Sequence, residues 1–305
     1  MYLSSFYLPG RQEEEALIAR QAARNGGRFG YVDNLYPCGL FTEKELEAVY
    51  FDRITVFCGG NGSGKSTLLN LIAERLGLAR TAPFNSGEMF TAYAAACSCG
   101  PGCDDDGRPL AIPEDSRILT SDDVFDYMLA VRSNNEEIAE KKAEAREEWA
   151  ALKFGDTVKF GGMEDYEALR LQVLARSRSV SRRQFIRRTA GQEAKLASNG
   201  ETALRFFTSR LKEDTLYCLD EPENSLSPKL QQELARELQE LARYCGCQFI
   251  LATHSPFLLA LEGARIYDLD RIPAAEARWW ELENVRAYYY FFRDHQRLFE
   301  REEKT

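Results

Sequence analysis

Short apolar runs rich in β-branched and aromatic residues recur along the chain and predict buried strands. They lie at residues 54–58, 216–219, 249–253 and 264–269. Continuous apolar runs of this kind are typical of parallel strands whose sheet is covered on both faces. The pattern therefore predicts a mainly parallel sheet.

Segments with apolar positions at helical spacing lie between these runs. Further helices are predicted at residues 166–176 and, with alternating charges on its surface, at 134–152. A preferred helix start, Ser227-Pro228, opens another. The alternation of strands and helices indicates an α/β fold, a mainly parallel sheet flanked by helices. The two clearest apolar stripes are Leu68, Leu69, Ile72 and Leu76, and Leu230, Leu234, Leu238 and Leu241.

The remaining segments carry weaker patterns. Residues 2–8 predict an edge strand, and residues 13–24 a short helix. A capping-box sequence at 42–45 predicts the start of another helix. Residues 84–96 predict a weak strand or a loop. The tail at 281–303 predicts a helix, and we expect its aromatic run, Tyr288 to Phe292, to pack on the domain.

A glycine-rich loop between the first buried strand and the next helix carries the most specific chemistry. Its glycines let the backbone curl so that several N–H groups point at one anion, and the helix N-terminus adds a positive dipole end. Lys65 brings a cation to the β- and γ-phosphates of a nucleotide, and the Ser66 hydroxyl can ligate Mg²⁺. The loop matches the phosphate-binding template G-x-x-x-x-G-K-[ST] with Gly59-Gly60-Asn61-Gly62-Ser63-Gly64-Lys65-Ser66.

Five further residues follow predicted strands or begin a predicted helix. Asp220 and Glu221 end the run at 216–219, where the first can hold Mg²⁺ and the second can activate a water for attack on the γ-phosphate. His254 follows the run at 249–253, on the ligand side of such a sheet. Ser198 and Gly200 lie at the start of a helix predicted at 202–211, a geometry that also binds anions.

Composition limits the classes of partner. The 305 residues carry a net charge of −9, so any contact with nucleic acid must be local. No apolar run approaches the roughly 20 residues that cross a bilayer. The first residues lack the pattern of a signal peptide. We therefore expect a soluble, cytoplasmic protein without a membrane partner, whose eight cysteines are reduced thiols.

Two clusters leave alternatives open. Cys97, Cys99 and Cys103 could contribute to a zinc site, but a fourth ligand or a second cluster is not evident, so a Gly/Pro/Asp-rich surface loop is the alternative. A second cluster, the Arg176–Arg188 region, could contact phosphates of nucleic acid or of a nucleotide in a partner subunit. Its alternative is a helix surface that neutralises the acidic segment before it. The arginines are Arg176, Arg178, Arg182, Arg183, Arg187 and Arg188.

The order of these motifs resembles the ABC-type P-loop ATPases. A Walker A loop is followed by Ala-Ser-Asn-Gly-Glu at the signature position, a Walker B strand and a histidine. The segments Leu-Asp-Glu-Pro-Glu-Asn-Ser-Leu-Ser-Pro and Ala-Thr-His-Ser-Pro look like the soluble RecF/SMC-like "AAA family ATPase" group. That group includes small stand-alone predicted ATPases and ATPase subunits of bacterial defence systems.

The resemblance implies a fold, a set of residues and a mode of action. It implies a single ABC-type ATPase domain over residues 1–305, with a variable helical insertion at 81–194. Ser66 and Asp220 would hold Mg²⁺, Glu221 would be the general base, and His254 would sense the γ-phosphate. Ser198 and Gly200 would contact the ATP of a second subunit, so ATP would join two chains head to tail. The ATP-binding residues would be Gly59, Gly60, Asn61, Gly62, Ser63, Gly64, Lys65, Ser66, Thr67, Ser198 and Gly200.

Departures from the family pattern concern the signature, Ser227 in place of an aspartate, and the Q-loop. Gln172 lies too late for the Q-loop, and Ser121 or Asp122 could occupy that position. Tyr36 and Tyr50 are candidates to stack on adenine.

The function that we expect is Mg-dependent ATP hydrolysis controlling a partner protein, an effector or nuclease, and acting on nucleic acid in DNA repair or phage defence. The alternatives are the nucleotide-binding subunit of an ABC transporter and a non-hydrolysing ATP sensor or scaffold.

Overall fold

The protein forms two compact units in a computed structural model. The first unit comprises Met1–Val124 and Ala203–Thr305, and the second comprises Phe125–Thr202. None of the helices that the structure describes combines the length and apolar character needed to span a membrane. The described residues are 1–24, 35–84, 86–104, 106–156, 166–177, 180–190 and 198–299.

The first unit is built on a six-stranded sheet with the order β5-β6-β7-β3-β8-β9. The first five strands in this order are parallel, and β9 pairs with β8 antiparallel. Every residue of β3 and β7 is buried, which explains their uninterrupted apolar sequences. The predicted α/β fold with a mainly parallel sheet is thus confirmed. The strands are β5 (Arg117–Thr120), β6 (Leu216–Asp220), β7 (Gln248–Ala252), β3 (Ile54–Cys58), β8 (Arg265–Asp268) and β9 (Ala275–Glu276).

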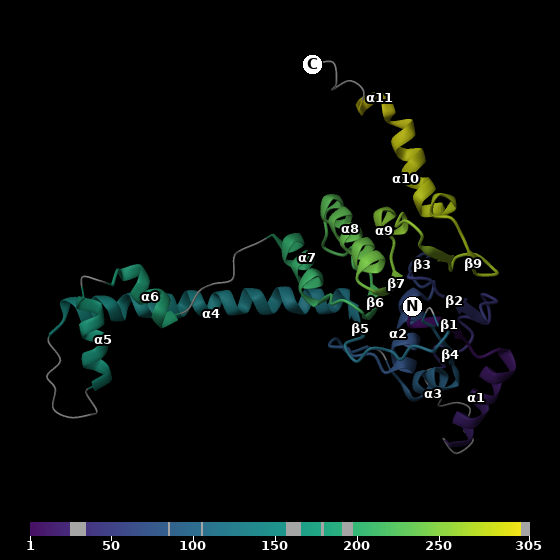
Figure 1. The fold of residues 1–305 in the computed structure, drawn as a ribbon, viewed down its shortest axis with the longest axis horizontal. Coiled ribbons are helices and arrows are strands. Elements are labelled where there is room, and N and C mark those ends of the chain that lie inside the picture. Colours follow the sequence, from purple (N-terminus) through teal and green to yellow (C-terminus); the bar gives the residue numbers. More distant parts are fainter. Residues whose placement is uncertain are drawn as a thin grey trace. The chain divides into compact units, whose positions relative to one another are not determined.

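Helices cover both faces of this sheet (Figure 1). Helix α2 (Lys65–Leu76) lies on one side, and α8 (Pro228–Tyr244) lies on the other. The stripe Leu234, Leu238 and Ala242 of α8 is buried. Ser227 is the N-cap residue of α8 and Pro228 follows it, as predicted. Helix α7 (Asn199–Arg210) begins in the second unit and continues into the first, and a short helix, α9 (Pro256–Leu259), follows β7.

A three-stranded antiparallel sheet with the order β2-β1-β4 joins the first unit. It consists of β2 (Ala48–Tyr50), β1 (Leu3–Tyr7) and β4 (Ser98–Pro101), and α1 (Arg11–Arg24) follows β1. The prediction of an edge strand at 2–8 was therefore wrong, because β1 pairs on both sides.

The Gln248 side chain of β7 is one of the connections between the two sheets, and the Tyr267 hydroxyl of β8, which bonds to the Tyr50 backbone of β2, is another. The Gln248 side-chain oxygen accepts hydrogen bonds from the backbone N–H groups of Tyr2 and Leu3 at 2.8 and 2.9 Å. Its side-chain nitrogen donates to the Leu3 carbonyl oxygen at 2.7 Å. Gln248 is completely buried, so these bonds satisfy a polar group that water cannot reach.

The segment before β5 differs from the sequence prediction. Residues 88–96 form a helix, α3 (Glu88–Ala96), whose face of Met89, Phe90, Tyr93 and Ala94 is buried. In the cysteine segment, Ser98–Pro101 form the strand β4, preceded by the buried Cys97. Cys103 is exposed and leads into an exposed turn at 106–109, so the expected surface loop is present only after the strand. Within the described residues, no three His, Cys, Asp or Glu side chains are grouped to hold a metal ion.

Residues 42–45 also differ from the prediction. They form turns, with the Glu43 N–H donating to the Gly39 carbonyl at 3.0 Å, and not the start of a helix.

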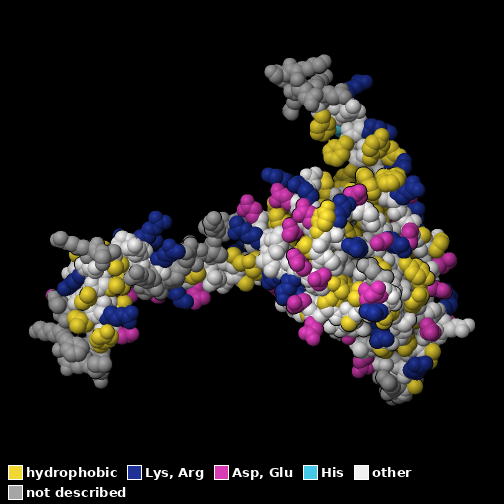
Figure 2. Space-filling model, in the orientation of Figure 1, with side chains coloured by type: hydrophobic (Ala, Val, Ile, Leu, Met, Phe, Trp, Pro, Cys, Tyr) yellow, Lys and Arg dark blue, Asp and Glu magenta, His cyan; other side chains and the backbone are white. Residues whose placement is uncertain are grey.

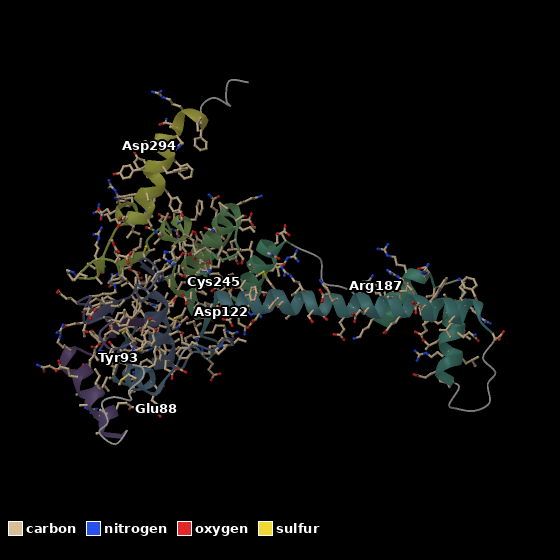
Figure 3. All side chains as sticks on the ribbon, turned by 180° about the vertical axis from the view of Figure 1, so that it is seen from behind. Glu88, Tyr93, Asp122, Arg187, Cys245 and Asp294 are labelled. Atoms are coloured by element: carbon tan, nitrogen blue, oxygen red, sulfur yellow. The ribbon has the colours of Figure 1, made fainter. Side chains whose placement is uncertain are left out.

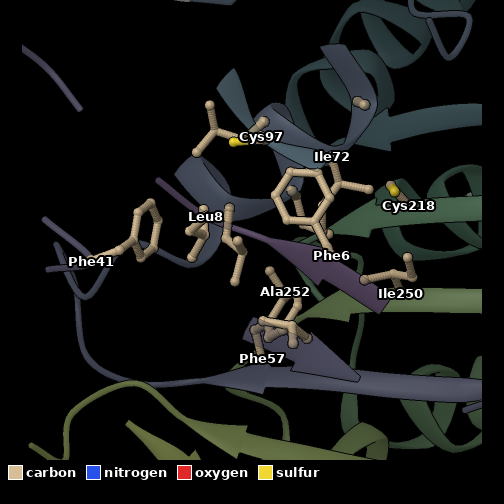
Figure 4. Close-up of a cluster of buried hydrophobic side chains, with 14 of the residues drawn as sticks. Phe6, Leu8, Phe41, Phe57, Ile72, Cys97, Cys218, Ile250 and Ala252 are labelled. Carbon is tan, nitrogen blue, oxygen red and sulfur yellow. The ribbon is translucent and has the colours of Figure 1, made fainter. Parts of the chain in front are cut away.

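The core of the first unit lies between the two sheets and the helices α2 and α3 (Figure 4). Phe6 of β1, Phe57 of β3 and Ile72 of α2 are fully buried within it, together with Ile250 of β7. These residues come from four elements that are distant in sequence. Their packing holds the glycine loop between β3 and α2 on a rigid support.

The second unit is helical. Helix α4 (Ser121–Phe154) begins in the first unit and continues into the second, where α5 (Tyr166–Arg176) and α6 (Arg182–Ala190) follow. The charged helix predicted at 134–152 is the carboxyl-terminal part of α4, and the helix predicted at 166–176 is α5. The proposed insertion at 81–194 and the single domain over 1–305 remain predictions.

The carboxyl-terminal helices expose their aromatic side chains. A 3-10 helix, η3 (Trp279–Glu281), precedes α10 (Glu283–Asp294) and α11 (Gln296–Phe299). The expectation that the aromatic run packs on the domain was wrong: Tyr289 is 61% exposed and Phe291 is 58% exposed. Figure 2 shows hydrophobic side chains gathered along these helices.

Candidate functional site

The glycine loop connects the carboxyl end of β3 to α2. Gly64 is the N-cap residue of α2 and has a φ of 99°, in the left-handed region that favours glycine. A Cβ atom at Gly64 would come within 3.1 Å of Leu40 Cδ2. No side chain caps α2, and its first turn contains no acidic residue. The first N–H groups of α2 are therefore available to an anion.

Lys65 is buried against the loop that precedes it. Its ammonium donates hydrogen bonds to the carbonyl oxygens of Gly59 and Gly60 at 2.8 and 3.0 Å, and the residue is only 4% exposed. The loop thus holds a cation beside its own free amides. This arrangement suits a phosphate group, because the amides and the ammonium can contact the same oxygens.

Ser66 and Asp220 bring the loop and the end of β6 together. The Ser66 hydroxyl donates to Asp220 Oδ1 at 2.9 Å. Burial raises the pKa of the Asp220 carboxyl to about 6, against the lowering effect of the Ser66 hydrogen bond. A hydroxyl and a carboxylate are the hard oxygen donors that Mg²⁺ takes from protein, with water and phosphate oxygens completing its shell. The pair fits a magnesium ion.

Glu221 follows Asp220 and turns toward the same loop. Its φ is 48°, an uncommon value for a residue other than glycine, and its N–H donates to the Ala252 carbonyl of β7 at 2.8 Å. Glu221 Oε2 accepts a hydrogen bond from Asn224 at 3.0 Å. Its Oε1 lies 3.7 Å from His254 Nε2. The backbone conformation therefore directs the carboxylate to the histidine that ends the neighbouring strand.

One cavity is lined by the glycine loop together with Lys65, Ser66 and Glu221. It has a volume of about 300 Å³. Tyr36 enters it, and its hydroxyl shares a 2.6 Å hydrogen bond with the Thr67 hydroxyl. The Tyr50 ring is 50% exposed and pairs instead with Tyr7, outside this cavity. The residues that line the cavity are Tyr36, Pro37, Cys38, Leu40, Asn61, Gly62, Gly64, Lys65, Ser66, Thr67 and Glu221.

Register explains why segments so distant in sequence meet here. Strands β3, β6 and β7 are parallel neighbours, with Ala252 opposite both Phe57 and Asp220. Their carboxyl ends therefore lie at one edge of the sheet, where ligands of open α/β sheets bind. The structure thus brings together the predicted residues from Gly59 to Thr67 with Asp220, Glu221 and His254.

The two predicted signature residues belong to the other compact unit. Ser198 and Gly200 lie at the carboxyl end of the helical unit, Phe125–Thr202. Ser198 Oγ accepts a hydrogen bond from the Glu201 N–H at 3.3 Å, and Glu201 Oε2 accepts one from the Ser198 N–H at 3.1 Å. This is the capping box that starts α7. A contact with a nucleotide remains a prediction for both residues.

Two carboxylates near the site have roles that sequence reasoning missed. Glu223 Oε1 accepts hydrogen bonds from the N–H groups of His254 and Ser255. Asp270 Oδ2 accepts one from the Gly60 N–H at 2.7 Å. Asp270 comes two residues after β8, so the rule that functional residues follow the carboxyl ends of parallel strands could have indicated it.

Beside Asp220, the start of α4 lines a second cavity, of about 360 Å³. Ser121 and Asp122 both lie on it. Gln172 instead lies on α5 in the helical unit, where its amide donates to the Asp156 carbonyl at 2.7 Å. Of these three, Ser121 and Asp122 are the ones positioned near the Asp220 carboxylate.

Residues 152–260 match the family described as "AAA domain, putative AbiEii toxin, Type IV TA system". The match spans a little over a third of the chain and confirms the resemblance to a P-loop ATPase family that the motifs indicated. Among curated proteins no match is found.

Several solved structures are similar at low identity. A dimeric post-hydrolysis state of the ATP-binding cassette MJ0796 bound to ADP and Pi has 17% identity and a TM-score of 0.35, and the alignment covers 76% of this chain and 88% of that chain. The SmcHead bound to the C-winged helix domain of ScpA has 16% identity, a TM-score of 0.38, and coverages of 79% and 94%. The SMC head domain from Thermotoga maritima has 14% identity, a TM-score of 0.35, and coverages of 91% and 99%. At these scores the likeness carries no conclusion about function, and the strand order of the chain itself establishes the fold.

Proposed function

We propose that the protein is an ATPase of the ABC type that binds ATP with Mg²⁺ and hydrolyses it to ADP and phosphate. The single observation that carries this proposal is the junction of Ser66, Asp220 and Glu221 at one edge of the sheet. Phosphate-binding amides, a magnesium-ligand pair and a candidate base all lie around this junction.

The phosphates would lie along the loop from Asn61 to Thr67. The uncapped amides at the start of α2 and the Lys65 ammonium supply donors for them. Asp270 accepts the Gly60 N–H and so helps to keep the loop in this shape before ATP arrives. Tyr36 borders the same cavity, which makes it the better of the two predicted candidates to contact the adenosine part of ATP.

Ser66 and Asp220 are the residues that would hold Mg²⁺, which when bound polarises the phosphate oxygens. Glu221 is the candidate general base, because its carboxylate borders the loop and accepts a hydrogen bond from Asn224. His254 is the candidate γ-phosphate sensor, 3.7 Å from Glu221. Its backbone is fixed by Glu223, so a γ-phosphate would meet a histidine that is already positioned.

ATP would also join two chains. The resemblance at residues 197–201 supports a head-to-tail dimer in which Ser198 and Gly200 complete the site of the other copy. ATP binding and hydrolysis would then switch the chain between a dimer and separate subunits.

We further propose that this switch controls a partner protein, an effector or nuclease, on nucleic acid. Two observations support a protein partner: the exposed aromatic side chains of α10 and α11, and the toxin–antitoxin description of the matching family.

ATP turnover by wild type and Glu221→Gln tests the proposal. The variant should bind ATP with unchanged affinity, hydrolyse it at least ~100-fold more slowly, and accumulate as a dimer in ATP and Mg²⁺. Glu262→Gln, an exposed glutamate on another surface, is the matched control and should turn over normally. Unchanged turnover in Glu221→Gln would remove Glu221 from the mechanism. Absence of ATP binding by the wild type would refute the proposed function itself.

A further inference from the structure

The helical unit contains a basic cavity that the ATPase chemistry does not use. The cavity lies between α4 and the first two turns of α6 and has a volume of about 700 Å³. Figure 3 labels Arg187 on α6, beside α4. Five of the eight lining residues are cations and none is acidic. The lining residues are Lys142, Arg146, Ser181, Arg182, Arg183, Gln184, Ile186 and Arg187.

Most of these cations are not neutralised by the protein. Within the described part of the chain, Arg146, Arg182 and Arg183 form no ion pair. Arg182 lies over the Trp149 ring at 5.3 Å, a contact that orients the guanidinium without removing its charge. In a chain of net charge −9, such a concentration of positive charge is local and costs repulsion unless an anion compensates it.

The structure separates the arginines of the 176–188 run by role. Arg176 donates to the carbonyl oxygens of Leu152 and Gly155, and so it satisfies the carboxyl end of α4. Arg182, Arg183 and Arg187 line the cavity. Arg178 and the Arg188 side chain lie outside the described residues. The neutralising role considered from the sequence does not account for Arg182 and Arg183, because neither pairs with a described carboxylate.

The spacing of the cations fits a ligand that repeats its charge. Lys142 and Arg146 are one turn apart on α4, and Arg183 and Arg187 are one turn apart on α6. Each pair therefore presents two charges separated by about 6 Å along a helix. Ser181 caps α6 through the Gln184 N–H at 3.2 Å, and the first turn of α6 has no acidic residue. The positive end of the helix dipole adds to the charge of the cavity.

We propose that this cavity binds the phosphodiester backbone of a nucleic acid. Four arginines and one lysine favour phosphate, because the guanidinium fork matches two phosphate oxygens. The uncharged polar residues of the lining are Ser181 and Gln184, which bond to each other. The cavity therefore offers few uncharged donors or acceptors for hydrogen bonds to base edges. Binding is therefore insensitive to sequence and strongly dependent on salt. The inference deepens the nucleic-acid part of the proposed function and does not depend on ATP hydrolysis.

Fluorescence anisotropy of the full chain with labelled oligonucleotides of about 30 nucleotides tests it, with duplex DNA, single-stranded DNA and single-stranded RNA as separate arms. Binding in any arm with a steep salt dependence, a log–log slope of up to about −4 for duplex DNA, is expected. Arg183→Glu should weaken binding at least ~10-fold and reduce the slope by about 1, and Arg183→Lys should restore most of the affinity.

Arg170→Glu is the matched control, because Arg170 is exposed on α5, outside the cavity, and the substitution changes the net charge equally. Its affinity should stay within about twofold of wild type. Equal losses in Arg170→Glu and Arg183→Glu would overturn the proposal, as would absence of binding in all three arms at low salt. Binding to anionic phosphatidylserine vesicles without binding to any oligonucleotide would overturn it as well. The Lys65→Ala variant should bind the oligonucleotide as tightly as wild type. The nucleic-acid proposal and the ATPase proposal can therefore fail independently of each other.

Discussion

The carboxylate of Glu223 accepts a hydrogen bond from the backbone N–H of His254 at 2.6 Å, and from that of Ser255 at 3.2 Å. Glu223 follows β6 and His254 follows β7, so one side chain joins the loops after two neighbouring strands. Glu221, two residues before Glu223, lies 3.7 Å from the His254 ring. The candidate base and the candidate phosphate sensor are thus held in one network.

Removing this connection should slow turnover without preventing ATP binding. In Glu223→Ala the two N–H groups lose a charged acceptor, and the His254 loop loses its support. We expect kcat to fall about 10-fold with KM for ATP changed by less than about threefold. Glu223→Gln keeps an acceptor oxygen and should recover most of the rate. Equal kcat values in all three proteins would contradict a positioning role for Glu223.

Lys65→Ala should strongly weaken the binding of ATP. The substitution removes the cation beside the free amides of the loop, and the loss of charge-assisted contacts to phosphate raises Kd by roughly 100-fold. Titration with a fluorescent ATP analogue measures the effect. Lys229→Ala, at an exposed position on α8, should bind as wild type. An unaltered Kd in Lys65→Ala would remove the loop as the phosphate site.

The stability of the nucleotide-free protein in a chelating buffer should depend on the ionisation of Asp220. Burial raises the pKa of this carboxyl to about 6 from its ordinary value of 3.8. Between these two values the native state holds more protons than the unfolded chain, so the free energy of unfolding decreases as pH rises through that window. Well above pH 6 the carboxyl is charged in both states, and the destabilisation that its burial causes is then complete.

Asp220→Asn removes that charge and should raise the free energy of unfolding by on the order of 2–3 kcal/mol at pH 8, and by much less near pH 4. Urea denaturation at the two pH values measures the difference. Asp294→Asn, an exposed carboxylate on α10, should change stability little at either pH. A lower stability of Asp220→Asn at pH 8 would show that the carboxylate stabilises the empty site.

Phe291 of α10 should be dispensable for folding. It is 58% exposed, so Phe291→Ala should change the free energy of unfolding by no more than about 0.5 kcal/mol. Phe207 of α7 is completely buried, and Phe207→Ala should cost about 3–5 kcal/mol. Urea denaturation compares the two variants. A loss above about 2 kcal/mol in Phe291→Ala would mean that α10 packs its aromatic side chains in solution.

The strands around the site could be predicted because their signal is local. An uninterrupted apolar run followed by glycines or carboxylates identifies β3 and β6 without knowledge of their neighbours. Strand β4 could not be predicted, because Gly100 and Pro101 are typical of a loop and its partner β1 lies at the start of the chain. Its strand character depends on that distant pairing.

The carboxylate of Glu223 escaped prediction for a related reason. It bonds to backbone N–H groups of a segment far away in sequence, and no side-chain pattern marks such an acceptor. For Asp270 only the position after β8 was a signal, and its bond to the Gly60 N–H was not. The aromatic run of α10 led to the opposite kind of error, because a contact was predicted that the structure does not have. Such side chains are usually buried, but nothing in the described first unit covers them.

The shared amide of Gln248 makes the amino-terminal strand part of the same cooperative unit as the phosphate loop. If the residues up to the end of β1 were removed, the buried Gln248 amide would lose its three hydrogen bonds to Tyr2 and Leu3 and keep only the one to the Asp52 carbonyl. A fragment that starts at β3 would leave this buried amide unsatisfied and would be less stable for that reason, so a shortened version of the protein should keep its first strand.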